Sequence, residues 1–328
     1  MSQPKAPKVT GEFKQKHLIS IADLAKTEIE YLLQTAKAFA HAEKLGQSTP
    51  ILQGKTVVNL FFENSTRTRF SFEVATRRLA GSTLNFAAQS SSLTKGETLI
   101  DTAKNLEAMR PHALVVRHSS AGSPVTLSRA VGTAVVNTGD GFHEHPTQAL
   151  LDCYTMQEKL GSLAGKRVVI LGDIAHSRVA RSNIYCLQKL GASVAVCGPP
   201  TLLPPKPEAL GVDYAYRPEA LLKDADVVMA LRVQLERQNR MQIPSIAEYS
   251  SVWGLNLERF SLMKKTALVL HPGPVNRGVE MDPEVADSPN SVILDQVANG
   301  VVVRMAVLAA ICNGPGLEKW LTDGGYRG

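Results

Sequence analysis

Residue types that mark several protein classes are scarce in this sequence. Four cysteines occur among 328 residues, and aromatic residues make up 5% of the chain. The cysteines lie far apart in apolar stretches, without a CxxC pair or a Cys/His cluster of metal-ligand spacing: Cys153, Cys186, Cys197 and Cys312. We therefore expect buried free thiols in a reducing compartment, and neither a disulfide framework nor a zinc site.

Long apolar runs are missing as well. The N-terminal residues MSQPKAPKVTGEFKQKH lack the apolar segment of a signal peptide, and no apolar run reaches the roughly 20 residues that cross a bilayer. We therefore expect a cytoplasmic protein with no membrane partner. Residues 1–16 are rich in Lys, Pro and Gln, which predicts a loose arm, and the first helix is expected to start at 20–23.

The chain is basic, with a formal net charge of +6. This charge favours an anionic partner, which could be nucleic acid, a membrane surface or a small acidic substrate. The basic residues occur singly inside separate motifs and are not interleaved with aromatic residues, as they are in nucleic-acid-binding surfaces. Scattered cations suit a small polyanion better than a duplex, so no nucleic-acid partner is expected.

Apolar segments of strand length alternate with helical patterns along the chain. The expected strands are 55–62, 84–88, 113–117, 134–137, 167–171, 193–197, 227–231 and 267–271, and the expected helices are 67–79, 97–109, 123–131, 147–160, 177–190, 218–222, 257–263 and 299–312. Strands that are apolar throughout predict parallel sheets with helices on both faces. Because the pattern runs through two halves, the expected fold is α/β with two such domains. The active site is expected in the cleft between them, at the carboxyl ends of strands.

The segment after the first expected strand is rich in anion-binding groups. Ser65-Thr66-Arg67-Thr68-Arg69 opens a helix directly after an apolar strand. Free N–H groups and hydroxyls at a helix start, together with an arginine, can bind phosphate. The alternative is an ordinary Ser/Thr N-cap beside two surface arginines. The segment alone leaves both interpretations open.

Three further segments place donors or cations near expected strand ends. The polar loop SSSLTKGET carries Lys95, either as a lid over an anion or as a solvated lysine. Arg117 ends an apolar strand, where it either contacts a ligand or snorkels at a sheet edge. In HEHPTQ, His145 and Gln148 can hydrogen-bond a carbonyl oxygen and an amide. Pro146 interrupts the spacing of a helical zinc motif, so no metal is expected.

The second half carries similar groups. VVILGDIAHSRVARS has one glycine where a dinucleotide-binding GxGxxG segment needs three, so no such cofactor is expected. Arg178 lies near a helix start, Arg232 and Gln234 follow one strand, and HPGP at 271–274 follows another. These segments suit loops lining a cleft, although HPGP also reads as a rigid turn.

Together the motifs resemble the aspartate/ornithine carbamoyltransferase family. FFENSTRTR, KGET, HPTQ, DIxHSRVARS, RVQxER and HPGPxNRG occur between residues 61 and 304 in the order found in its aspartate-specific chains. Ornithine-specific members are expected to show a different amino-acid-binding loop and a cysteine in the HPGP region, and neither is evident. The resemblance implies transfer of a carbamoyl group from carbamoyl phosphate to L-aspartate, an early step of pyrimidine synthesis, without cofactor or metal.

The resemblance also implies an organisation. It places a carbamoyl-phosphate-binding domain at 1–146 with 300–328 and an aspartate-binding domain at 147–299. It implies a homotrimer in which the Lys95 loop reaches into the neighbouring subunit's site. The long N-terminal arm is similar to that of members that assemble with a dihydroorotase or dihydroorotase-like chain.

Each residue that matches a family motif receives an implied role. Ser65, Thr66, Arg67 and Thr68 bind the phosphate, with Ser91 and Lys95 of the next subunit; Thr68, Arg117 and His145 polarise the carbamoyl oxygen; Gln148 and the backbone carbonyls of Gly273 and Pro274 hold the carbamoyl amine; Lys95, Arg178, Arg232 and Gln234 hold the aspartate carboxylates. The catalytic residues are then Arg67, Thr68, Lys95, Arg117 and His145. Some members carry Leu in place of Gly273, and the backbone contact is expected to survive this difference.

Two alternatives stay open at this point. One is a related carbamoyltransferase that uses another amine such as ornithine, although the extra cation of ornithine would fit poorly beside Arg232. The other is a non-catalytic assembly paralogue that keeps the fold. Every transferred position is intact, which favours an enzyme.

Overall fold

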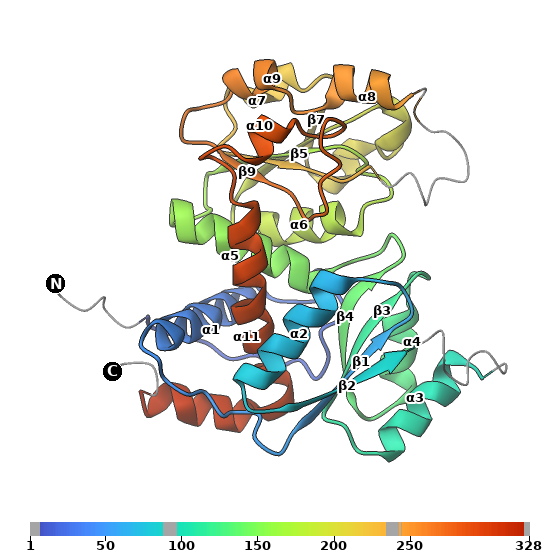
Figure 1. Ribbon diagram of the computed structural model, residues 1–328, viewed down its shortest axis with the longest axis vertical. Coiled ribbons are helices and arrows are strands. Elements are labelled where there is room, and N and C mark those ends of the chain that lie inside the picture. Colours follow the sequence, from blue (N-terminus) through green and yellow to red (C-terminus); the bar gives the residue numbers. More distant parts are fainter. Residues whose placement is uncertain (1–6, 88–96, 234–242, 244, 325–328) are drawn as a thin grey trace. The chain divides into compact units, whose positions relative to one another are not determined.

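Two compact units divide the chain. The computed structural model describes residues 7–87, 97–233, 243 and 245–324. One unit combines Met1–Leu150 with Ala298–Gly328, and the other is Leu151–Val297. Both divisions fall inside helices, in α5 (Pro146–Leu160) and α11 (Ile293–Thr322), so each of these helices belongs partly to both units (Figure 1).

The first unit contains a four-stranded parallel sheet flanked by helices (Figure 1). Its elements are α1 Lys26–Lys44, β1 Thr56–Phe61, α2 Thr66–Arg78, β2 Ser82–Ala87, α3 Leu99–Ala108, β3 Ala113–His118, α4 Ser123–Ala130 and β4 Ala134–Asp140. The strand order is β2-β1-β3-β4, and every pairing is parallel. All four strands therefore end at one edge, where Phe61 pairs with Arg117 and His118 pairs with Asp140.

Apolar side chains cover both faces of this sheet. β1 is buried at every position from Val57 to Phe61, although successive side chains of a strand point to opposite faces. On one face β1 packs against α3 and α4 in a cluster that contains Val58, Leu60, Ala103, Leu114, Val116, Leu127, Val131 and Val135. α2 contacts β1 and β2 and buries Phe72 and Ala75. The prediction of a parallel sheet buried on both faces is confirmed.

The segment before α1 pairs with the edge strand β4. The amide of Leu18 donates to the carbonyl of Val135 at 2.9 Å, and its carbonyl accepts from the amide of Asn137 at 2.8 Å. This pairing extends the sheet by a short parallel bridge. The helix start expected at 20–23 is therefore wrong, and α1 begins at Lys26.

Glu28, in the first turn of α1, also binds this segment. Its carboxylate accepts hydrogen bonds from the amide of Lys14 at 3.2 Å, the side-chain amide of Gln15 at 3.0 Å and the amide of Ala25 at 2.9 Å. The described part of the expected loose arm is thus tied to α1.

The second unit contains a five-stranded parallel sheet of order β7-β6-β5-β8-β9. Its elements are β5 Arg167–Leu171, α6 Arg178–Lys189, β6 Ser193–Cys197, the 3-10 turns Pro200–Leu202 and Pro207–Leu210, β7 Asp213–Ala215, α7 Glu219–Leu222, β8 Val227–Ala230, α8 Ile246–Trp253, α9 Leu257–Ser261, β9 Leu268–Leu270 and α10 Pro283–Ala286. The sequence did not predict β7, α8 or α10. Each is short, and β7 exposes Asp213 and Tyr214, so it lacks the apolar run that marks the other strands.

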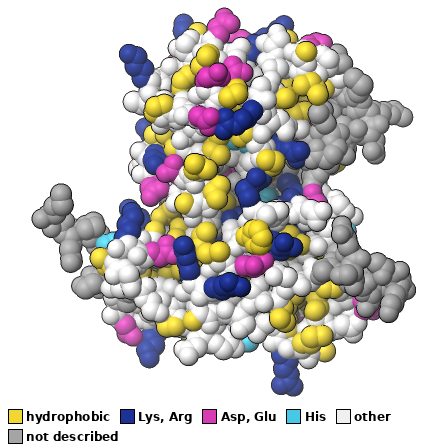
Figure 2. All heavy atoms as spheres, in the orientation of Figure 1, with side chains coloured by type: hydrophobic (Ala, Val, Ile, Leu, Met, Phe, Trp, Pro, Cys, Tyr) yellow, Lys and Arg dark blue, Asp and Glu magenta, His cyan; other side chains and the backbone are white. Residues whose placement is uncertain are grey.

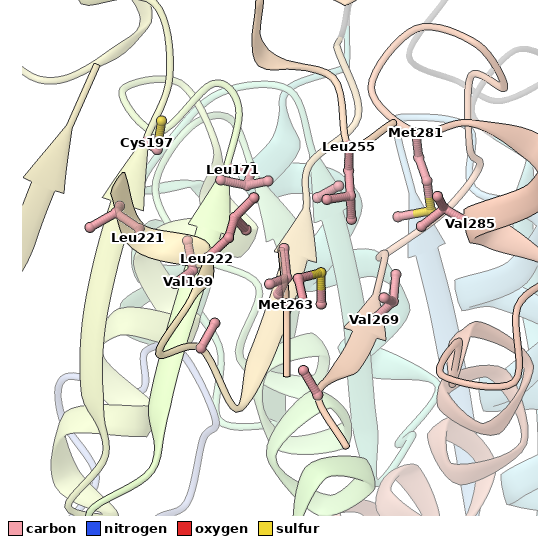
Figure 3. Close-up of a cluster of buried hydrophobic side chains, with 14 of the residues drawn as sticks. Val169, Leu171, Cys197, Leu221, Leu222, Leu255, Met263, Val269, Met281 and Val285 are labelled. Carbon is pink, nitrogen blue, oxygen red and sulfur yellow. The ribbon is translucent and has the colours of Figure 1, made fainter. Parts of the chain in front are cut away.

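The core of this unit covers one face of the sheet with α7, α9 and α10. Figure 3 shows Val169 and Leu171 of β5 near Leu222 of α7, and Val285 of α10 beside Met281, all in one cluster. The three cysteines Cys153, Cys186 and Cys197 are buried free thiols, whereas Cys312 is partly exposed.

The closing helix α11 is longer than the expected 299–312. Asn313 leaves helical geometry with φ −158° and ψ 59°, and its side-chain amide donates to the carbonyl of Ile51 at 2.7 Å. By length and composition α11 could cross a membrane, which corrects the expectation that no apolar run is long enough. Its apolar stretch includes Val303 and Leu308, which are both fully buried. A buried core helix can have the same length and composition as a membrane-spanning one.

Candidate active site

Helix α2 begins where β1 ends. Ser65 is its N-cap residue, with extended backbone angles of φ −158° and ψ 92°, and its hydroxyl makes no capping hydrogen bond. An ordinary serine N-cap accepts such a bond. The first-turn N–H groups have no partners within a helix, and with the helix dipole they attract anions. Thr66 and Arg67 are exposed and Thr68 is buried, so this turn offers both a cation and hydroxyls at the sheet edge.

Arg117 is held at the same edge, near the end of β3. Its Nη1 donates to the carbonyl of Thr138 at 3.0 Å, and its Nε lies 3.7 Å from a carboxylate oxygen of Glu63. The amide of Phe62 donates to the carbonyl of Arg117 at 2.9 Å, which joins the start of the β1–α2 loop to β3. The side chain is 12% exposed, so a largely buried, oriented guanidinium lies beside the loop that leads to Ser65.

His145 and Gln148 lie at the entry to α5, which follows β4. The carbonyl of His145 accepts from the amides of Gln148 at 3.0 Å and Ala149 at 3.3 Å, as expected where a helix begins. Both side chains are buried. Because β4 neighbours β3, this entry lies at the sheet edge where Arg117 lies. The structure thus brings three sequence motifs to the carboxyl edge of one sheet.

Asp140, which the sequence interpretation assigned no role, organises the loop between β4 and α5. Its buried carboxylate accepts from the side-chain amide of Asn137 at 2.8 Å and the amide of Gly122 at 2.7 Å, and Nδ1 of His143 lies 3.0 Å away. Burial acts to raise the pKa of this carboxyl, but the hydrogen bonds from His143, Gly122 and Asn137 outweigh it and lower the pKa. The loop before His145 is therefore built on a buried carboxylate.

Glu144, next to His145, joins the same loop to the N-terminal segment. Its buried carboxylate accepts from the hydroxyl of Ser20 and from the amide of Ile21 at 2.9 Å. His143 faces Asp140 instead. Within the described ranges, no group of three His, Cys, Asp or Glu side chains is arranged to hold a metal ion.

Asp140→Asn is expected to lower the free energy of unfolding at pH 7 by about 2–3 kcal/mol, because buried donors lose a charged acceptor. The folded-state pKa lies below its ordinary value of 3.8, so the stabilisation is present above that value and is lost as the pH falls through the folded pKa. Urea unfolding at pH 7 and pH 3 should show the difference from the unmodified protein narrowing at pH 3.

The matched control is Asp287→Asn. The Asp287 carboxylate lies 2.6 Å from Arg277 on an exposed surface, where an ion pair contributes little. Equal losses of stability for the two variants, or a loss for Asp140→Asn that does not change with pH, would contradict the role given to Asp140.

Arg178 is the first residue of α6, after the carboxyl end of β5. Ser177 caps this helix, since its hydroxyl accepts from the amide of Ala180 at 3.1 Å. In the loop before it, Asp173 accepts from the amide of His176 at 3.0 Å and lies 2.9 Å from its Nδ1. Burial raises the pKa of Asp173, and the contacts with His176 limit that rise. Arg178 is 4% exposed, so a nearly buried guanidinium stands at a helix N-terminus.

Arg232 follows β8, the strand beside β5, and the HPGP segment follows β9, the strand beyond β8. The amide of Leu231 donates to the carbonyl of Leu171 at 2.8 Å, which continues the ladder up to Arg232. The segment 271–274 directly follows β9. Because β5, β8 and β9 are neighbours and parallel, Arg178, Arg232 and this segment follow strands that end at one sheet edge. Gly273 adopts φ 68°, a left-handed conformation that glycine tolerates and leucine does not without strain.

The predicted site residues therefore fall into two sets, one at the carboxyl edge of each sheet. Ser91, Lys95 and Gln234 lie outside the described residues. On the face shown in Figure 2, Lys and Arg side chains are spread out and interleaved with Asp and Glu. The cations on that face thus do not form the continuous stripe typical of a duplex-binding surface.

Both halves of the chain match models of one protein family. Residues 16–158 match the family model described as the carbamoyl-P binding domain of aspartate/ornithine carbamoyltransferase, and residues 164–311 match its Asp/Orn binding domain. The aspartate carbamoyltransferase catalytic subunit of Anaeromyxobacter sp. (strain Fw109-5) is 52% identical over 303 residues, 92% of this chain and 96% of that relative. The chain belongs to the aspartate/ornithine carbamoyltransferase family.

Solved structures of this carbamoyltransferase family share the fold. Ornithine carbamoyltransferase from Pyrococcus furiosus aligns with a TM-score of 0.82 at 32% identity, over 91% of this chain and 97% of that one. Aspartate transcarbamoylase from Trypanosoma cruzi, solved with carbamoyl phosphate, aligns with a TM-score of 0.83 at 28% identity, over 94% of this chain and 99% of that one. The fold thus matches an ornithine enzyme and an aspartate enzyme equally well and does not distinguish the two amines. The site residues and the relatives of higher sequence identity distinguish them.

Proposed function

We propose that this carbamoyltransferase transfers the carbamoyl group of carbamoyl phosphate to the amine of L-aspartate, giving N-carbamoyl-L-aspartate and phosphate. The start of α2 carries the proposal, because its cap hydroxyl is not used for capping and Arg67 follows directly at the sheet edge shared with Arg117 and His145. The 52% identity to a chain named aspartate carbamoyltransferase catalytic subunit supports aspartate over ornithine.

The first unit is proposed to bind carbamoyl phosphate. The phosphate would be held by the first turn of α2 with its hydroxyls and cation: Ser65, Thr66, Arg67 and Thr68. Arg117, His145 and Thr68 would donate to the carbamoyl oxygen, on which negative charge develops as the amine attacks. A pre-aligned donor at such an oxygen contributes about 3–4 kcal/mol of transition-state stabilisation. Gln148, with the carbonyls of Gly273 and Pro274, would hold the carbamoyl amine.

The second unit is proposed to bind L-aspartate through Arg178 and Arg232, with Gln234 and a neighbouring subunit's Lys95. These cations offset the repulsion between two anionic substrates. Holding both substrates close together in the reactive orientation removes much of the entropic barrier. The departing phosphate can accept the proton of the attacking amine. The reaction then needs no dedicated protein base.

A comparison of amines tests this proposal. The purified protein should carbamoylate L-aspartate with a kcat/KM about 10³-fold above that for L-ornithine, because a like charge placed beside Arg232 costs several kcal/mol. Product formation measured at equal amine concentrations decides the matter. A preference for ornithine would contradict the aspartate assignment.

The assembly is proposed to be a cytoplasmic homotrimer in which Ser91 and Lys95 complete the site of the neighbouring subunit, with a dihydroorotase or dihydroorotase-like chain as a further partner. The support is the order of family motifs and the polar KGET loop. The further partner is supported by the N-terminal arm, which resembles that of family members that assemble with such a chain. Sedimentation equilibrium of the purified chain would give three times the chain mass of 35.4 kDa if the trimer is correct.

A further inference from the structure

A buried histidine–glutamate pair lies beneath two of the loops given substrate roles above. The side chains of His271 and Glu280 are 0% and 1% exposed, and Nε2 of His271 lies 3.2 Å from a carboxylate oxygen of Glu280. A buried carboxylate is costly unless its charge is paired and hydrogen-bonded. Neither residue belongs to the substrate-binding sets.

His271 fixes the loop that follows it. Its Nδ1 accepts the amide hydrogen of Gly273 at 2.8 Å. A ring nitrogen that accepts a hydrogen bond carries no proton, so the proton of the neutral imidazole is on Nε2, which faces Glu280. One imidazole therefore joins the backbone of the HPGP segment to the Glu280 carboxylate.

Glu280 joins that segment to the residue after Arg232. One carboxylate oxygen accepts from the amide of Asn276 at 2.6 Å, and the other lies 3.5 Å from the amide of Val233. The side-chain amide of Asn276 donates to the carbonyl of Val233 at 3.1 Å. Backbone groups of two separate loops thus meet at a single carboxylate.

Apolar packing holds this carboxylate in place. Met281, the next residue, lies in the core cluster of the second unit (Figure 3). Val279, on the other side, packs against the smaller cluster that contains Val233 and Tyr249. The carbonyl of Glu280 accepts from the amide of Leu255 at 3.0 Å. Residues on both sides of Glu280 are therefore anchored, and the carboxylate is a rigid reference point for the two loops.

The same set of contacts continues to the helices shared by the two units. The amide of His271 donates to the side chain of Gln296 in α11 at 3.0 Å, and Gln296 donates to Asp152 in α5 at 2.7 Å. Asn183 of α6 donates to the other oxygen of Asp152 at 2.8 Å. Both the ring and the backbone of His271 are therefore fixed.

We propose that His271 and Glu280 are positioning residues that set the spacing between the Gly273–Pro274 carbonyls and Arg232. The inference rests on the proposed function, since these carbonyls and Arg232 are the groups given to the carbamoyl amine and to aspartate. Displacing a substrate-binding group by about 1 Å can reduce turnover about 100-fold. The pair therefore acts on the reaction without touching either substrate.

Glu280→Gln tests the proposal, because the amide keeps the size of the carboxylate but replaces one of its two oxygens, each of which faces a backbone amide, by an N–H donor. Its kcat/KM for aspartate should fall about 10- to 100-fold, mainly through a higher KM. Inhibition by inorganic phosphate, which reports on the α2 site, should stay within about twofold. The matched control is Glu219→Gln, which removes a 2.6 Å ion pair with Arg259 elsewhere in this unit and should leave the KM for aspartate unchanged.

Two variants of His271 give an independent measurement. Asn can still accept the amide hydrogen of Gly273, whereas Ala cannot, so His271→Asn should retain at least tenfold more activity than His271→Ala at equal folded fraction. An unchanged KM for aspartate in Glu280→Gln, or equal activities of the two His271 variants, would overturn the positioning role. Failure of the proposed function would appear separately, as absence of aspartate carbamoylation by the unmodified protein.

Discussion

Arg67→Ala is expected to lower kcat/KM for carbamoyl transfer by about 10³-fold, the size of effect seen when a charged group that stabilises a transition state is removed. Arg67 is exposed in the first turn of α2, where the helix dipole already favours an anion. Negative charge builds on the phosphate as it leaves. Removing the cation that stabilises this charge should therefore reduce kcat as well as raise KM. Steady-state formation of N-carbamoyl-L-aspartate at saturating aspartate measures the effect.

The control for this variant is on the same helix. Arg78 ends α2, away from the sheet edge, and its Nη1 pairs with a carboxylate oxygen of Glu43 at 2.5 Å. Arg78→Ala should therefore keep full activity. Arg67→Lys should recover part of the loss, because lysine supplies the charge without the two-pronged geometry of arginine. Turnover that persists in Arg67→Ala would show that the phosphate site is elsewhere, and an inactive unmodified protein would favour the non-catalytic paralogue.

The positions of the candidate groups could be predicted because the end of a buried strand is visible locally in a sequence. The apolar run that ends at Phe62 is followed three positions later by Ser65, and ALVVR ends at Arg117. Parallel pairing then brings such ends to one edge, which the register of Phe61 with Arg117 confirms. Predicting that these residues lie at one sheet edge thus required only the apolar runs that mark buried strands and the parallel direction of those strands.

The buried carboxylates could not be predicted in the same way. Glu144 binds Ser20, 124 residues earlier in the chain, and Asp140 binds Gly122, 18 residues earlier. A carboxylate that accepts backbone amides from distant loops looks the same in sequence as a solvated surface acid. Its role depends on tertiary partners, so Asp140, Glu144 and Glu280 were identified only in the folded chain.

The wrong helix start has a similar cause. Ser20 is a residue type that favours N-caps, and apolar positions at helical spacing follow it. Its hydroxyl instead donates to Glu144 and accepts from the amide of Ala22 at 2.9 Å. Strand pairing at Leu18 and this buried contact hold the segment outside the helix, so tertiary structure overrides a local signal.

Arg178→Ala is expected to raise the KM for aspartate by about 10²-fold or more, because a charged donor to a carboxylate contributes about 1.5–3 kcal/mol and a buried one acts in a low dielectric. Arg178 is 4% exposed and follows a capped helix start, so its guanidinium is held in a defined orientation. Inhibition by inorganic phosphate should change little, since the residues proposed to bind phosphate are in the first unit, at the start of α2. Initial rates with aspartate varied at saturating carbamoyl phosphate measure the KM.

Arg181→Ala is the matched control, since Arg181 lies in the next turn of α6, is partly exposed and belongs to neither set. Arg181→Ala should leave the KM for aspartate and the inhibition by inorganic phosphate unchanged. A bisubstrate analogue that joins a phosphonate to aspartate separates the remaining possibilities. If the two sets serve one reaction, Arg67→Ala and Arg178→Ala must each weaken binding of this analogue, whereas phosphate alone should respond only to Arg67→Ala. Weakening by one variant only would mean that the other arginine serves a different ligand.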